Sequence, residues 1–241
     1  MSMNAVKLNT ISHYQNLLYF PKKTEINFKS SEIKDEFSYS QNSILQQNCK
    51  IGDITIIVLK LVGLKYPLLK NHLIGTSLYA KAFAQEMGLS KKQIDETETA
   101  ALLHDVSKIG HSDKFFQGEA SSLDREKNKL HQKISSDIAK TIIPFKDKIA
   151  GLIEHHHDEF KTNGKNIPIE DRIISVCDAF DSMTTKKYRT SIPKTPQKAV
   201  IELKKNEKGQ WDPEIVEKFC NFISKNDFQF FKNVTKYTQS V

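Results

Sequence analysis

The chain has 241 residues and a formal net charge of +7, and its hydrophobic fraction of 38% is sufficient for a buried core. We therefore expect a globular protein, with one generous domain or one domain plus an extension. The basic balance favours an anionic partner such as a phosphate ester. The lysines are spread along the chain instead of forming one block with aromatic residues, which argues against nucleic acid.

Cysteine usage and hydropathy exclude two further classes. Cys49, Cys177 and Cys220 are widely spaced and form no CxxC pair, so neither a disulfide framework nor a thiolate zinc site is indicated. The strongest apolar run, 54–64, is interrupted by Lys60, and residues 1–10 lack the apolar core of a signal peptide. We expect a cytoplasmic protein without a membrane span.

The first part of the chain differs in composition from the rest. Residues 1–48 are polar, and their one compact apolar cluster, 17–20, is ended by Pro21. This composition predicts a poorly specified N-terminal extension, either a short docking helix or the remnant of a sensory module. One domain is expected to follow over residues 49–241.

Helical spacing dominates from residue 51 onward. Apolar residues within 54–62 repeat at three-and-four spacing, although the β-branched run 54–58 leaves a strand possible. A helix is expected over 67–87, with Gly88 as its stop. The next helix begins at Ser90, which forms a capping box with Gln93, and it leads into residues 104 and 105.

The remaining elements complete a helical bundle. Residues 109–126 read as a loop because they contain two glycines and several serines. Helices are then expected over about 124–144, 146–157 and 170–185, with a turn at 163–166 and two further helices after Pro196 and Pro213. The predicted fold class is all-α, with about seven or more helices.

Six of the eight histidines, together with two aspartates, form an ordered set of possible metal ligands. These are His72, the pair His104 and Asp105, His131, the run His155, His156 and His157, and Asp178. Imidazole and carboxylate suit divalent metals. Each residue alone has an ordinary alternative: a hydrogen-bonded core histidine, a solvated helix end, or an aspartate in an ion pair, with Asp181 as a rival to Asp178. Their arrival from four separate helices favours a metal site.

Neighbouring ligands indicate two ions. Adjacent helical residues point about 100° apart, so His104 and Asp105 reach one centre only at a helix end or beside a pair of ions. The Asp105 carboxylate could bridge such a pair. The same reasoning predicts that His156 and His157 serve different ions.

These residues resemble a known family. The sequence HDVSK at 104–108 is similar to the HDxxK core of the HD phosphohydrolase superfamily. His131, the pair His156 and His157, and the segments 172–181, 188–189 and 211–213 resemble the HD-GYP subfamily, whose members hydrolyse cyclic di-GMP. The resemblance spans about residues 50–225. The subfamily's DGxGYP loop is degenerate here, because 159–168 reads EFKTNGKNIP and lacks the tyrosine-proline pair.

The resemblance implies an HD-domain helical bundle and assigns roles. The metal ligands it implies are His72, His104, Asp105, His131, His156, His157 and Asp178. Leu68 stands where three-metal members carry a glutamate, so two divalent ions, iron or manganese, are expected. Asp105 and Lys108 are the implied catalytic residues, and Lys187 and Arg189 the implied phosphate contacts.

The implied function is a metal-dependent phosphodiesterase that hydrolyses a cyclic dinucleotide, with cyclic di-GMP giving pGpG or GMP. Two alternatives remain open from the sequence. The enzyme could act on another nucleotide or phosphoester. A non-catalytic metal or nucleotide sensor could instead signal through protein contacts. The degenerate loop is the sequence hint for this alternative, and the retained ligand set argues against it.

Overall fold

The computed structural model describes residues 51–143, 147–186, 192–206 and 208–240, so the N-terminal extension expected over 1–48 lies outside the described residues. The described residues form helices joined by turns, with no strand among them, and the all-α prediction is confirmed. The elements are α2 (Ile51–Lys65), α3 (Pro67–Glu86), α4 (Lys91–Leu103), η1 (Val106–Gly110), η2 (Phe115–Gln117), α5 (Ser122–Lys129), α6 (His131–Ile142), α7 (Asp147–His155), α8 (Phe160–Asn163), η3 (Gly164–Asn166), α9 (Ile169–Thr184), α10 (Pro196–Lys205) and α11 (Pro213–Ser240).

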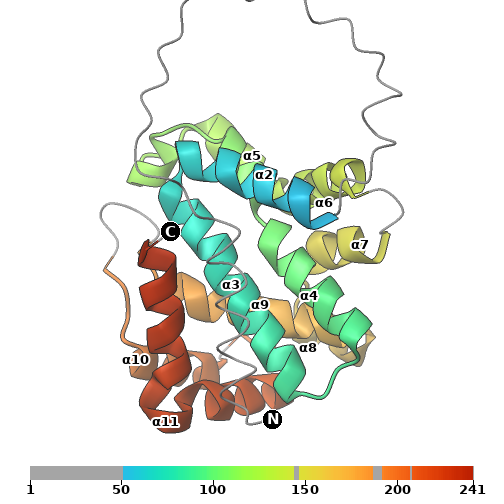
Figure 1. The fold of residues 1–241 in the computed structure, drawn as a ribbon, viewed down its shortest axis with the longest axis vertical. Helices are drawn as coiled ribbons and strands as arrows, with labels where there is room; N and C mark the ends of the chain where they lie inside the picture. The colour runs from blue at the N-terminus through green and yellow to red at the C-terminus, as the bar shows by residue number, and fades with distance from the viewer. Residues whose placement is uncertain (1–50, 144–146, 187–191, 207, 241) are drawn as a thin grey trace, which may run out of the picture.

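Helix α3 runs through the middle of the molecule and contacts α2, α4, α9 and α11 (Figure 1). Pro67 stands in its first turn, where the missing N–H is harmless. Fully buried aromatic side chains fill the space between α3, α9 and α11, and the Tyr79 and Phe180 rings meet edge-on with centroids 5.4 Å apart. This core fixes the helices that carry the site.

The helix boundaries around the site follow from local capping. The predicted capping box at Ser90 is present, since its side chain accepts from the backbone N–H of Gln93 while the Gln93 side chain accepts from Ser90. Helix α4 begins there and ends at Leu103, so residues 104 and 105 lie at a helix end. Gly88, with a φ of 74°, follows α3 as predicted.

Two expectations are corrected by the structure. The helix expected over 124–144 is two helices, α5 and α6, separated at Leu130, whose φ of −100° and ψ of 0° are not helical. A second capping box, between Ser121 and Asp124, starts α5 earlier than the apolar spacing indicates. The expected loop 109–126 contains the short elements η1 and η2 and the start of α5.

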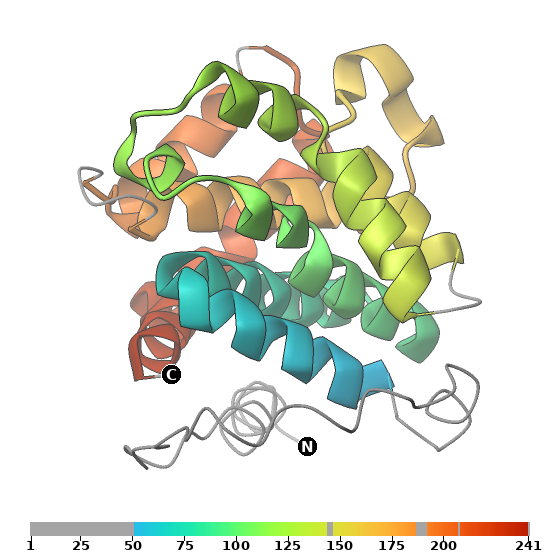
Figure 2. The same cartoon turned by 90° about the horizontal axis from the view of Figure 1, so that it is seen from above.

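The remaining ambiguities are also resolved. Residues 51–65 form helix α2, which lies against α3 (blue and teal in Figure 2). The turn predicted at 163–166 comprises the end of α8 and η3, with Gly164 at a φ of 54°. Among the helices of the described ranges, none has the length and hydropathy needed to cross a bilayer.

Candidate metal centre

Five helical elements bring the predicted ligands to one place. His72 lies on α3, the pair His104 and Asp105 follows α4, His131 opens α6, the pair His156 and His157 follows α7, and Asp178 lies on α9. Their ligand atoms form three overlapping groups, each with all atoms within 4.8 Å of one another. The first is His72, His104 and Asp178, the second is His131, His156 and His157, and a third, His104, Asp105 and His156, overlaps both. The seven residues implied by the sequence resemblance therefore converge.

The first group lies between α3, α4 and α9. Nε2 of His72 is 3.1 Å from Oδ1 of Asp178, and Nε2 of His104 is 3.6 Å from the same oxygen. The two imidazole rings meet edge-on, with centroids 5.3 Å apart. Two ring nitrogens and one carboxylate oxygen therefore face a common point.

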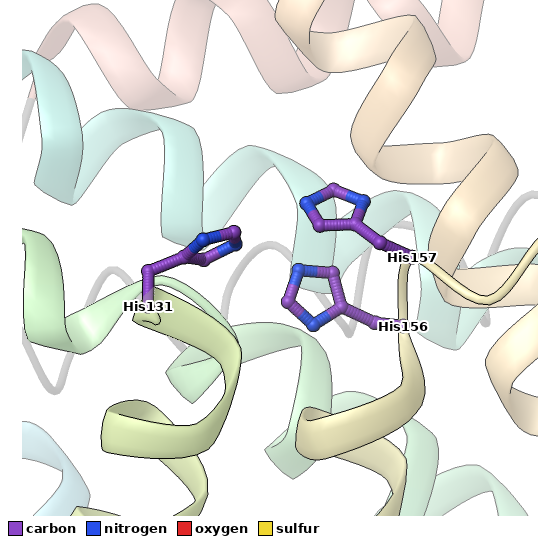
Figure 3. Close-up of side chains that lie close together, drawn as sticks. All are labelled: His131, His156 and His157. Carbon is purple, nitrogen blue, oxygen red and sulfur yellow. The ribbon is translucent and has the colours of Figure 1, made fainter. Parts of the chain in front are cut away.

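The second group is formed by three imidazoles that point toward one another (Figure 3). The ring of His131 lies 5.4 Å from that of His156 and 5.1 Å from that of His157. His156 and His157 share this group, and His156 alone of the two also belongs to the group with His104 and Asp105. Helix α7 ends at His155, so the next two side chains are not held 100° apart and can turn to the same side.

Asp105 lies between the two groups. Its Oδ2 is 3.4 Å from Nε2 of His104 and 3.7 Å from Nε2 of His72, while its Oδ1 is 3.4 Å from Nε2 of His131. One carboxylate oxygen thus faces each group, which is the geometry that a bridging carboxylate needs.

Backbone carbonyls fix the tautomer of three imidazoles. In each case Nδ1 donates to the carbonyl oxygen three residues earlier: His104 to Ala101 at 2.8 Å, His131 to Asn128 at 2.5 Å and His156 to Ile153 at 2.6 Å. Because a carbonyl oxygen only accepts, Nδ1 carries the proton and Nε2 keeps its lone pair in the neutral ring. All three lone pairs are directed into the cluster, as metal-binding histidines require.

The buried polar atoms of the cluster fit divalent cations. Nε2 of His104, His131 and His156 and Oδ1 of Asp105 are buried without a hydrogen-bond partner among the described residues. Such unsatisfied groups are rare in folded proteins and costly. Among the described residues at the cluster, three carboxylates, on residues 105, 178 and 181, are accompanied by the ammonium of Lys108. Imidazole nitrogen with excess carboxylate is the donor set of Zn, Mn and Fe sites.

Electrostatics keep most of these imidazoles neutral. Burial lowers the pKa of His131, His156 and His157, that of His156 to well below its usual value. Burial also opposes protonation of His104, but the Asp105 and Asp178 carboxylates outweigh it and raise the pKa of that ring. Although burial would raise the pKa of Asp105, the Lys108 ammonium and the neighbouring histidines hold it well below its ordinary range. The Asp105 side chain is therefore an anion.

Asp181, the rival to Asp178, has a different place. Its Oδ2 accepts from Nδ1 of His72 at 2.6 Å, on the far side of the ring from Asp178. Asp181 therefore orients His72, while Asp178 faces the cluster. A Cβ built on Gly75 would lie 2.3 Å from Oδ1 of Asp181, so the carboxylate fits only because residue 75 has no side chain. Sequence reasoning missed Gly75, because a glycine within a helix gives no signal for a contact with a distant carboxylate.

Lys108 lies beside the bridging position. Its Nζ donates to Oδ2 of Asp105, and its side chain lines a cavity that also contains His72 and Asp105. The 3₁₀ turn η1 follows Asp105 directly and carries the ammonium back over the carboxylate. The lysine is thus positioned to contact an anion at the cluster.

Some predicted residues lie elsewhere. His155 is exposed, and its Nδ1 is 3.2 Å from Oδ2 of Asp158, so it is a neighbour of the cluster, as the sequence reading had it. Lys187 and Arg189 lie outside the described residues. His111, which we left out of the ligand set, is buried against Phe115 with ring centroids 4.1 Å apart and belongs to none of the three groups.

Comparison with known proteins gives one family model and several relatives. Residues 69–183 match the family model of the HD domain. A cyclic di-GMP phosphodiesterase of Thermotoga maritima is 31% identical over 147 residues, which cover 56% of this chain and 39% of that protein. The 3′3′-cGAMP-specific phosphodiesterase 3 of Vibrio cholerae is 27% identical over 153 residues, which cover 59% of this chain and 33% of that protein.

Among solved structures, the HD domain of the L. monocytogenes phosphodiesterase PgpH aligns with a TM-score of 0.45 and 16% identity, covering 76% of this chain and 95% of that one. The present chain spans less than half the length of these two curated relatives.

Proposed function

We propose that this protein is a metal-dependent phosphodiesterase that hydrolyses a cyclic dinucleotide and holds two divalent cations. The observation that carries the proposal is the position of Asp105, with one oxygen directed to each of two histidine groups. Such a pair of cations supplies Lewis-acid chemistry, namely an activated water and charge stabilisation at the phosphoryl oxygens. Iron or manganese suits this donor set.

The protein's own residues have distinct roles in the proposal. His72, His104 and Asp178 hold one cation, and His131, His156 and His157 hold the other. Asp105 joins the two groups, and its low pKa keeps it ionised at neutral pH. The Lys108 ammonium donates a hydrogen bond to a phosphate oxygen of the bound substrate. It already donates to an anionic oxygen, that of Asp105, in the same cavity.

Cyclic di-GMP is the substrate we propose, with pGpG or GMP as product. Two relatives are named for hydrolysis of cyclic di-GMP and of 3′3′-cGAMP, and both are cyclic dinucleotides. The chain would be an HD-GYP protein with a degenerate signature loop, because α8 and η3 occupy the place where the subfamily has the GYP sequence. Lys187 and Arg189 remain proposed phosphate contacts.

The test compares two neighbouring histidines, His156 as the proposed ligand and His155 as the control. The full chain, loaded with Mn²⁺ or Fe²⁺, is incubated with cyclic di-GMP and 3′3′-cGAMP, and the products are separated by chromatography. We expect linear dinucleotide or mononucleotide from the parent protein, loss of product in His156→Ala, and parent activity in His155→Ala, because only His156 points into the cluster. If either nucleotide binds but no product forms after long incubation, the proposed phosphodiesterase activity is wrong, and a non-catalytic nucleotide sensor is the remaining function. Equal rates on unrelated phosphoesters would overturn the substrate class.

A further inference from the structure

A small cavity that is open to solvent lies beside the proposed metal centre, and both polar and apolar residues line it. The polar lining residues are His72, Asp105 and Lys108. The apolar lining residues include Leu68, Phe115 and Phe116. A ligand that contacts both kinds of residue joins an anionic group to a flat or apolar one.

The two phenylalanines form an aromatic corner. Phe115 and Phe116 are each half-buried, and their rings meet nearly at right angles, with centroids 5.1 Å apart. Phe116 also packs on Tyr66, at 4.0 Å between centroids with an interplanar angle of 33°. Phe116 contacts the hydrophobic core as well, whereas Phe115 is outside that cluster of the described residues. Phe115 is therefore less involved in the core than Phe116, although its ring also packs on the buried His111 ring, with centroids 4.1 Å apart.

The segment that carries these rings is held in place by hydrogen bonds. The Tyr66 hydroxyl donates to the carbonyl oxygen of His111 at 2.7 Å, and Nζ of Lys65 donates to that of Ile109 at 2.9 Å. On the other side, the buried Asp124 carboxylate accepts from the backbone N–H of Ser112 at 2.9 Å and from its hydroxyl at 2.7 Å. A site fixed in this way loses little entropy when a ligand is bound.

Aromatic faces next to a cationic phosphate contact are the means by which proteins hold nucleotides. Each nucleobase has a π-face that stacks on such rings, and the contact tolerates different bases. An uncharged aliphatic group could pack on the rings but would not present an anion to Lys108. We propose that this cavity is a nucleobase subsite in which one base of the cyclic dinucleotide stacks on Phe115, an inference that rests on the proposed phosphodiesterase function.

The experiment separates stacking from apolar burial and from folding. Phe115→Ala removes the ring, Phe115→Leu keeps apolar volume without a π-face, and Phe115→Tyr keeps the π-face. Leu123→Ala on the neighbouring helix α5 is the control, because Leu123 is an exposed apolar residue outside the cavity. Each variant is assayed for KM and kcat with cyclic di-GMP and for binding of a 2-aminopurine analogue of that nucleotide, whose fluorescence is quenched by stacking.

We expect KM to rise roughly 5- to 100-fold in Phe115→Ala, with kcat within about twofold, as for loss of an interaction made equally in the ground and transition states. The Leu variant should behave like the Ala variant, and the Tyr variant and Leu123→Ala like the parent. Quenching of the analogue should be present in the parent and lost in Phe115→Ala.

Two failures are distinguishable. If the parent hydrolyses cyclic di-GMP but Phe115→Ala retains its KM and its quenching, the subsite is wrong while the phosphodiesterase stands. If the parent binds the analogue with Phe115-dependent quenching yet forms no product, the subsite stands and the proposed reaction is wrong.

Discussion

Nδ1 of His72 donates a hydrogen bond to Oδ2 of Asp181 across 2.6 Å, which joins the central helix α3 to α9 behind the proposed metal centre. Both side chains are buried. The bond fixes the ring so that Nε2 faces Asp178, at 3.1 Å from its Oδ1. A carboxylate in this position both orients a ligand histidine and raises its basicity.

Asp181→Ala should therefore lower affinity for Mn²⁺ by about 10- to 100-fold while the ligand side chains are all retained. Equilibrium titration of the metal-stripped protein with Mn²⁺ measures the change. Asp137→Ala, which removes an exposed carboxylate on α6, is the control and should bind as the parent does. Equal affinity in Asp181→Ala and Asp137→Ala would show that the hydrogen bond has no influence on the site.

Gly75→Ala, on α3, should also lower the affinity for Mn²⁺, because residue 75 lies against the Asp181 carboxylate of α9. The added Cβ would lie 2.3 Å from Oδ1 of Asp181, so the carboxylate must move and the bond to His72 is strained. We expect a loss of about 1–3 kcal/mol in the free energy of unfolding, as for other overpacked core positions, together with weaker Mn²⁺ binding. Urea denaturation and the same titration provide the two measurements.

The control for Gly75 is another helical glycine. A Cβ on Gly151, in α7, would have nothing within 4 Å. Gly151→Ala should stabilise the protein by roughly 0.5–1 kcal/mol through helix propensity alone, with no change in metal binding. If Gly75→Ala were also stabilising, the close approach of Asp181 would not be a constraint.

Asp105→Ala should reduce turnover by orders of magnitude, because it removes the carboxylate that lies between the two histidine groups. The helices should persist, since the core is formed by residues elsewhere, and far-ultraviolet circular dichroism provides that check. Activity near that of the parent would mean that Asp105 does not link the two groups in the working protein.

Asp171 predicts a pH dependence of stability that is separate from catalysis. Burial, followed by repulsion from Glu170 and Asp158, raises the pKa of this carboxyl to about 8, and its Oδ1 has no hydrogen-bond partner among the described residues. The folded state thus keeps a proton that the unfolded state releases near pH 4. The associated stability is fully present below pH 4 and is lost as the pH rises to about 8.

Asp171→Asn should remove that slope and stabilise the protein at pH 8 by about 1–3 kcal/mol, since a neutral amide replaces a buried charge. Urea denaturation of the metal-stripped parent and variant, each at pH 5 and at pH 8, measures the free energy of unfolding in the four cases. A parent protein with equal stability at both values, or a variant that is weaker at pH 8, would contradict the assignment of a buried, protonated carboxyl.

Much of the fold was predictable because its signals are local. The capping box at Ser90, the glycine stop at residue 88 and the prolines at 196 and 213 each act within one turn of chain, and helices begin or end there. The break at Leu130 was missed because Ile134 and Ile138 continue the apolar spacing past it. The capping box of Ser121 and Asp124 is also a local signal, and it sets the start of α5 at Ser122, before the apolar spacing begins.

The convergence of the histidines was predictable from residue types and order, but their grouping was not. Whether His156 and His157 turn to the same side depends on where α7 ends, and helix ends are the least certain feature of a sequence-based prediction. The roles of Asp178 and Asp181 depend on which side of one imidazole each occupies. Gly75 matters only because α9 passes close to α3 at that point.

The most direct test of the dinuclear assignment is the metal content of the purified full chain after equilibrium dialysis against Mn²⁺, determined by elemental analysis. The geometry predicts about two equivalents per chain in the parent, and at most one in His131→Ala, which removes a ligand of the second group alone. One equivalent or fewer in the parent, or two in the variant, would contradict a pair of cations at this site.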